Sequence, residues 1–121
     1  MKFMQLKLKA TKLEMTPSIR DYVQEKMDMI EKYLGDIQIF NCDVEIEKSV
    51  GGQHKGEIFR AEVNLQLPHE ILRVEKTEED MYKAIDKVKD HLELVIKKYK
   101  DKLYDRKKAA KLGAAEVEEG E

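Results

Sequence analysis

Residues 77–102 read TEEDMYKAIDKVKDHLELVIKKYKDK, and their apolar side chains recur every three or four positions. At about 100° per residue, this spacing places one apolar stripe along a helix. The stripe contains Met81, Ile85, Val88, Leu92, Val95, Tyr99 and Leu103. Lys83, Lys87 and Lys98 fall roughly opposite. The stretch therefore predicts a helix with one face for a core and another for an anionic partner.

The predicted helix begins near Thr77, because Thr77 followed by Asp80 resembles a capping box, and it continues to about Lys108. Its charge differs from that of the rest of the chain. Residues 83–111 carry 11 basic and 5 acidic residues, although the whole chain has a formal net charge of -2. A local basic stripe can bind nucleic acid whatever the average charge, but an ordinary solvated helix face remains the alternative.

The residues before this helix predict one further helix and four strands. Alternation predicts a strand over about residues 2–11, and Thr16-Pro17 starts a helix that ends at Gly35. Strands follow at about 37–47 and 59–67, separated by a flexible turn at 49–56. Pro68-His69 then turns the chain into a fourth strand that holds Leu72 and Val74.

This order, β-α-β-β-β-α, predicts an α+β fold with two helices packed on one face of a four-stranded mixed sheet. The opposite sheet face stays exposed, with a charge too mixed for a uniform phosphate platform. Its residues are Lys7, Lys9, Asp43, Glu45, Glu47, Arg60, Glu62, Asn64 and Gln66. A chain of 121 residues with 41% hydrophobic content fits one small domain.

Several classes of function find no support in the sequence. No apolar run is long enough for a membrane span, so we expect no membrane partner and a cytoplasmic protein. The single cysteine, Cys42, lies among alternating apolar residues and is expected to be buried. His54, His69 and His91 show no metal-ligand spacing. We therefore expect no enzyme activity, no metal and no cofactor.

Lysines at helical spacing can follow a nucleic-acid backbone, because each neutralises a phosphate without reading a base. Structured RNA fits better than a single strand, since the sequence shows no cluster of exposed aromatic residues.

Three segments resemble the ribosome hibernation factors, the family that contains short hibernation-promoting factor and protein Y. They are MTPSIRDYVQEKMDMIEKY at 15–33, EEDMYKAID at 78–86 and KKYKDK at 97–102. The resemblance covers about residues 3–108. It implies a fold similar to double-stranded RNA-binding domains, and binding to the whole ribosome through the small subunit and its rRNA. It also implies inhibition of translation, because the factor occupies the decoding region between the subunits and blocks tRNA and mRNA.

The resemblance also assigns RNA-binding residues. Arg20, Lys26 and Lys32 match basic positions of the first helix, and Lys98 and Lys102 match basic positions of the second. Lys83, Lys87, Lys97 and Lys100 are added from the helical spacing. Met29, His91 and Leu94 depart from the family pattern, because members often carry a basic residue there.

The resemblance divides the chain into a ribosome-binding domain at residues 1–108 and a flexible acidic tail at 109–121. The tail is too short for a further dimerisation domain, and we expect a monomer when the protein is free. Its glutamates resemble the acidic extension of protein Y, or serve only solubility. The alternative function is a regulator that binds a protein partner through the exposed sheet face.

Overall fold

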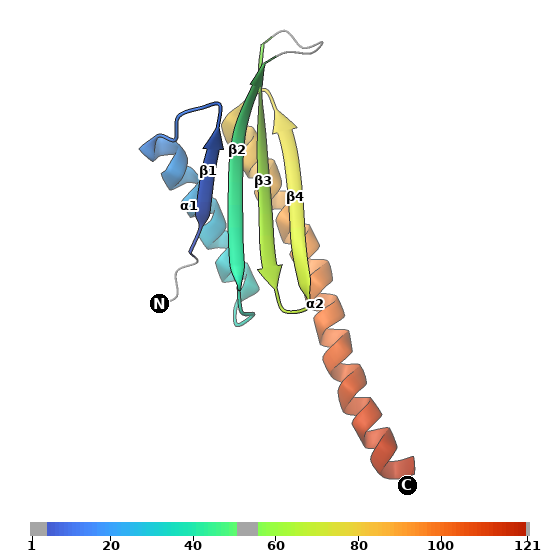
Figure 1. Cartoon of the computed structure of the whole chain (residues 1–121). Coiled ribbons are helices and arrows are strands. Elements are labelled where there is room, and N and C mark those ends of the chain that lie inside the picture. Colours follow the sequence, from blue (N-terminus) through green and yellow to red (C-terminus); the bar gives the residue numbers. More distant parts are fainter. Residues whose placement is uncertain (1–4, 51–55, 121) are drawn as a thin grey trace.

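The computed structural model describes residues 5–50 and 56–120, with their side chains except those of Val50 and residues 112–120. The elements are β1 (Lys7–Thr11), α1 (Pro17–Leu34), β2 (Asn41–Val50), β3 (Glu57–Leu67), β4 (Glu70–Glu78) and α2 (Met81–Gly120). The strands form one sheet in the order β1-β2-β3-β4, with both helices on one face (Figure 1). β1 and β2 are parallel and the other two pairs are antiparallel. The predicted α+β fold is confirmed.

The first helix has both predicted caps. The Thr16 hydroxyl oxygen accepts a hydrogen bond from the Ile19 N–H at 3.2 Å, and Pro17 occupies the first turn. Gly35 has a φ of 63°, which favours glycine, and its N–H donates to the Glu31 carbonyl. The apolar stripe between the caps is buried as predicted: Ile19, Val23, Met27, Ile30 and Leu34.

The second helix buries a wider stripe than the sequence indicated. Ile85, Val88, Leu92 and Tyr99 are buried as predicted, whereas Met81, Val95 and Leu103 are only partly buried. Ala84 and Ile96 are both fully buried, although the predicted stripe omitted them. The stripe is wide because α2 packs against the sheet and against α1 at the same time.

The boundaries of the first two strands differ from the predicted ones. The first strand begins at Lys7, since Gln5 and Leu6 lie outside it, and residues 2–4 of the predicted strand lie outside the described residues. The second strand begins at Asn41 rather than Ile37, because the Ile37 N–H donates to the Leu34 carbonyl and closes a turn. β2 also includes Ser49 and Val50, which were predicted to belong to the flexible turn. Residues 51–55 of that turn are not described.

Both predicted ends of α2 were wrong. Thr77 belongs to β4, where it pairs with Arg60 of β3, and the helix begins at Met81 instead. Asp80 caps it, since its Oδ1 accepts hydrogen bonds from the backbone N–H groups of Tyr82 and Lys83 at 2.8 and 3.2 Å. The helix does not end near Lys108 but continues to Gly120; residues 109–111 are Ala-Ala-Lys, strong helix formers that favour its continuation past Lys108.

Candidate nucleic-acid interface

The helices are joined near their N-terminal ends by a cluster of aromatic and charged side chains. The Tyr22 hydroxyl of α1 donates to Asp86 Oδ1 of α2 at 2.5 Å, and Lys26 Nζ lies 3.5 Å from the same oxygen. The Tyr22 and Tyr82 rings meet edge to face with centroids 4.8 Å apart. The hydrogen bond to Asp86, together with burial, raises the pKa of Tyr22 to about 12. We call these four residues, Tyr22, Lys26, Tyr82 and Asp86, the interhelical cluster.

A second contact joins the helices near the C-terminal end of α1. Lys100 Nζ lies 4.4 Å from the centre of the Tyr33 ring and donates a hydrogen bond to the Tyr33 carbonyl oxygen. Tyr22 of α1 contacts Asp86 of α2, and the later residue Tyr33 contacts the later residue Lys100. The two helices therefore run parallel and side by side (Figure 1). Their outer surfaces therefore form one face of the molecule, opposite the open face of the sheet.

Four of the nine predicted RNA-binding residues are already engaged within the chain. Lys26 and Lys100 contact the other helix, as described above. Lys87 Nζ lies 2.9 Å from Glu78 Oε1, and Lys102 Nζ lies 3.5 Å from Glu70 Oε1. These last two pairs join α2 to β4, and both lysine side chains are more than half exposed, so an anionic partner can compete for the lysine.

The other five predicted residues are exposed, namely Arg20, Lys32, Lys83, Lys97 and Lys98. Among the side chains that the structure describes, none of the five has an acidic partner within ion-pair distance. An exposed cation without a partner can contact a phosphate without first breaking an internal pair. These five are therefore the strongest phosphate-binding candidates of the nine.

The nine residues do not form a single row. Arg20 lies about 120° around α1 from Lys26 and points to the flank away from α2, since six helical steps of about 100° separate the two. Lys83 and Lys97 face outward on α2, and Lys98 lies on the side nearer β4, four residues before Lys102. The exposed carboxylates of Asp21 and Glu25 interrupt the α1 surface.

The open sheet face carries charges that neutralise one another. Arg60 donates from Nη2 to Glu45 at 2.6 Å and from Nε to Glu47 at 2.9 Å, and its Nη1 lies 3.6 Å from Glu62 and from Glu75. The Thr11 hydroxyl and Arg60 lower the pKa of Glu45, and Glu47 raises that of Arg60. We call these five charged residues the Arg60 cluster. It confirms the prediction that this face is no uniform phosphate platform.

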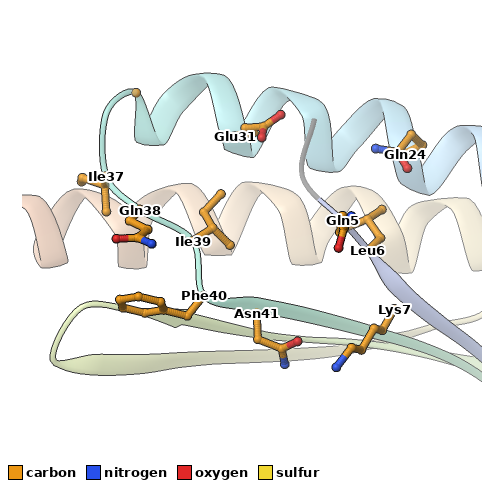
Figure 2. A pocket seen from close by; sticks show the side chains of 11 residues that line it. Gln5, Leu6, Lys7, Gln24, Glu31, Ile37, Gln38, Ile39, Phe40 and Asn41 are labelled. Carbon is orange, nitrogen blue, oxygen red and sulfur yellow. The ribbon is translucent and has the colours of Figure 1, made fainter. Parts of the chain in front are cut away.

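No catalytic constellation is found in the described part of the chain. A groove of about 990 Å³ lies between α1, the start of β1 and the loop before β2, but amides such as Gln24 and Asn41 and apolar side chains such as Phe40 line much of it (Figure 2). Cys42 is fully buried, and burial raises the pKa of its thiol to about 12, so it is no nucleophile. His69 lies in the β3–β4 turn and His91 is exposed on α2, while His54 lies outside the described residues.

A metal site and a membrane-spanning helix are also absent from the described residues. Within residues 5–50 and 56–120 no cluster of three or more histidine, cysteine, aspartate or glutamate side chains could hold a metal ion. None of the described helices combines the length and apolar character that crossing a membrane requires.

The geometry of two parallel helices on a four-stranded sheet agrees with a known protein family. The model of the family described as "Sigma 54 modulation protein / S30EA ribosomal protein" matches residues 6–104. The chain belongs to this family. The matched range contains both helical contacts and all nine predicted RNA-binding residues.

Curated relatives within the family are named ribosome hibernation promotion factor. The one from Deinococcus radiodurans is 32% identical over 93 residues, which are 77% of this chain and 47% of the relative. The one from Lactococcus lactis is 33% identical over 100 residues, which are 79% of this chain and 49% of the relative. The chain thus spans about half the length of the curated relatives it matches. The resemblance to ribosome hibernation factors is confirmed.

Two solved structures have a similar fold. The N-terminal domain of Thermus thermophilus protein Y is 34% identical, with a TM-score of 0.61 over 77% of this chain and 94% of that domain. A ribosomal subunit interface protein from Coxiella burnetii is 22% identical, with a TM-score of 0.58 over 79% of this chain and 97% of the other. At that identity the second likeness supports the fold alone.

The sequence did not predict the contact between the helices: of the interhelical cluster only Lys26 was assigned a role, in RNA binding, although Tyr82 and Asp86 lie in the segment DMYKAID that carries the resemblance. The structure gives this segment two tasks at once. Asp80 caps α2, and Asp86 two turns later accepts the hydrogen bond that holds α1 in place. The signal was present in the sequence, but the partner Tyr22 lies 64 residues before Asp86.

Proposed function

We propose that this chain binds the ribosome and inhibits translation by occupying the decoding region of the small subunit, between the subunits, where it blocks tRNA and mRNA. The observation that carries the proposal is the match of the family model to residues 6–104, whose curated relatives are named ribosome hibernation promotion factor. The action is steric and involves no turnover.

The charge distribution supports the helical face as the surface that contacts rRNA. Five exposed basic side chains on the helices have no internal ion pair among the described residues, whereas Arg60 on the sheet face is surrounded by four carboxylates. Contacts between lysine and phosphate release counterions and follow the shape of folded RNA without reading its bases. The helical face therefore meets the RNA, and the sheet face points away from it.

Sedimentation with purified ribosomes at two salt concentrations tests the proposal. The variant K83Q/K97Q/K98Q removes three exposed positive charges from α2, and the matched control K7Q/K9Q/K12Q removes three exposed charges near β1. We expect wild type and control to sediment with the small subunit or the whole ribosome. The α2 variant should bind more weakly, and its affinity should depend less steeply on salt, by a slope of about three.

Two results would refute the proposal in different ways. If the wild-type protein stays at the top of the gradient at both salt concentrations, the hypothesis that it binds the ribosome is refuted. Equal loss of binding in the α2 variant and in the control would show that net charge matters and that the helical face does not.

The alternative, a regulator that docks a protein through the sheet face, predicts the opposite pattern. Binding through apolar anchors such as Ile71, which is 62% exposed on that face, would depend little on salt. The substitution Ile71→Ser would then abolish binding, and the α2 variant would bind like wild type.

A further inference from the structure

The second helix continues well past the end of the first. α1 ends at Leu34, and the Lys100 contact with Tyr33 marks that level on α2, whereas α2 runs on to Gly120. Figure 1 shows this part of α2 projecting beyond the sheet. Every side chain from Tyr104 to Lys111 is exposed. The side of α2 that faces α1 earlier in the helix is therefore open to solvent here.

That open side carries a stripe of basic residues with a tyrosine among them. The residues recur at intervals of three or four, which places them on one side of the helix. They are Lys97, Lys100, Tyr104, Lys107, Lys108 and Lys111, and we call them the arm stripe. Asp101 and Asp105 lie on an adjacent side and border the stripe, since Asp101 is four residues from Lys97 and Asp105 is three residues from Lys108.

Lys100 is the one member of the arm stripe with an internal partner among the side chains that the structure describes. Among the described side chains, Lys97, Lys107, Lys108 and Lys111 form no ion pair. Lys107 and Lys111 are like charges four residues apart, an arrangement that weakens an isolated helix. An anionic partner removes this repulsion, and so the stripe gains more from binding than the lysines that are already paired.

Tyr104 indicates which anion fits. Its side chain is 70% exposed, and it lies between Lys100 and the pair Lys107 and Lys108 on the same side of the helix. A phenol ring in this position offers a flat surface on which a nucleobase can stack, while the lysines contact the flanking phosphates. Only a strand with unstacked bases can use both features, because the bases of a duplex are occupied by their neighbours.

We propose that the arm stripe is a second RNA-binding element, which holds a single-stranded segment by phosphate contacts and one stacked base on Tyr104. The proposal extends the earlier expectation of structured RNA alone, because exposure of Tyr104 inside a lysine stripe appears only in the structure. It rests on the proposed ribosome binding for the source of the RNA, but not for the interaction itself. Tyr104, Lys107, Lys108 and Lys111 belong to the arm alone, whereas Lys97 and Lys100 are shared with the surface formed by α1 and α2.

Fluorescence anisotropy with a short labelled oligouridylate and the full-length protein tests this directly. We expect wild type to bind, and Tyr104→Ala to lose at least about fivefold in affinity, the lower end of the effect of one stacked base. Tyr104→Phe keeps the ring and should bind within about twofold of wild type. The variant K107Q/K108Q should lower the slope of log K against log salt by about 1.4, and the control K7Q/K9Q should leave it unchanged.

The proposal fails if wild type does not bind the oligouridylate at about 50 mM salt, or if Tyr104→Ala binds as tightly as wild type. It also fails if a duplex of equal length binds more tightly than the single strand. Folding is checked by far-UV circular dichroism, and these exposed positions lie outside the core. Ribosome sedimentation of the same proteins separates the two proposals, since loss of wild-type sedimentation refutes ribosome binding whatever the arm does.

Discussion

The substitution Arg60→Met gives a strong test of how the sheet face is stabilised. It keeps an apolar stem of similar length but leaves Glu45, Glu47 and Glu62 without their shared cation. The Arg60 side chain is 20% exposed, and these three carboxylate side chains are between 18% and 27% exposed. The cluster is thus partly desolvated, so its charges interact more strongly than an ordinary surface pair.

The expected loss of stability follows from the contacts. Two hydrogen bonds between charged groups, at 2.6 and 2.9 Å, contribute about 1.5 kcal/mol each at the lower end of their range, which suits their partial exposure. The two contacts at 3.6 Å add little, and the uncompensated carboxylates then repel one another. We expect the free energy of unfolding to fall by about 2–3 kcal/mol at pH 7.

The pH dependence gives a second, independent check. The Thr11 hydroxyl and then Arg60 lower the pKa of Glu45 in the folded protein. A lowered pKa contributes stability above the unfolded value of about 4.3, and this stability is lost as the pH falls through the folded pKa. Arg60→Met removes the arginine part of that contribution. The difference between wild type and variant should therefore be largest near pH 7 and should narrow below about pH 4.

Urea unfolding followed by circular dichroism at both pH values measures these differences. The matched control is Arg73→Met on the same sheet face, because Arg73 is exposed and its Nε donates a hydrogen bond to the neutral Asn64. We expect the control to lose less than about 1 kcal/mol. A loss below about 0.5 kcal/mol for Arg60→Met, or a difference that stays constant between the two pH values, would contradict the reasoning.

Two further substitutions test the packing of the helices. Tyr22→Phe should lower the free energy of unfolding by about 1–2 kcal/mol in urea, because Asp86 loses its donor. The raised pKa of Tyr22 means that this stability is present below about pH 10 and is lost toward pH 12; a Tyr22 that ionises near pH 10 in an ultraviolet titration would contradict this. Ile96→Ala should cost about 2–5 kcal/mol, whereas its exposed neighbour Leu94→Ala should cost at most about 0.5; similar losses would refute the assigned helix face.

Prediction from the sequence was most reliable for elements whose caps and hydrophobic pattern all lie within one segment of the chain. Thr16-Pro17, the stripe from Ile19 to Leu34 and Gly35 define α1 without reference to the rest of the chain. The period of two likewise placed Cys42, Val44 and Ile46 on the buried face of β2. In each case short-range geometry alone decides the structure, and the predictions are confirmed.

The errors occur where a distant segment decides. Thr77 and Asp80 are both good capping residues, and local chemistry does not choose between them. Pairing between β3 and β4 continues as far as Glu78, opposite Phe59, and these backbone hydrogen bonds keep Thr77 in the strand. Ile96 was omitted for a similar reason, because a stripe of helical spacing gives the direction of the core but not the number of surfaces that the helix will meet.

The candidate site shows the same difference between what a local segment determines and what a distant segment determines. The sequence identified the basic residues of both helices, but it gave no sign that Lys87 pairs with Glu78 or that Lys102 pairs with Glu70. Nor could it show that Arg20 faces away from α2, because that depends on which side of α1 meets the second helix. Whether any of the nine residues contacts RNA stays a prediction.

The two faces of the molecule differ less in the number of charged side chains than in whether these side chains have ion-pair partners. A chain with a formal net charge of -2 is a poor polyanion binder if its charges are averaged. On the sheet face, however, four carboxylates surround one arginine, so much of the negative charge is held beside a fixed cation. On the helical face Lys83 and Lys97 are exposed and unpaired among the described side chains, and Lys98 is likewise exposed and unpaired on the side of α2 nearer β4. Because screening limits exposed charges to about 8 Å at physiological salt, an approaching RNA is affected mainly by the face it meets, and the helical face offers it unpaired lysines beside the interrupting carboxylates of Asp21 and Glu25.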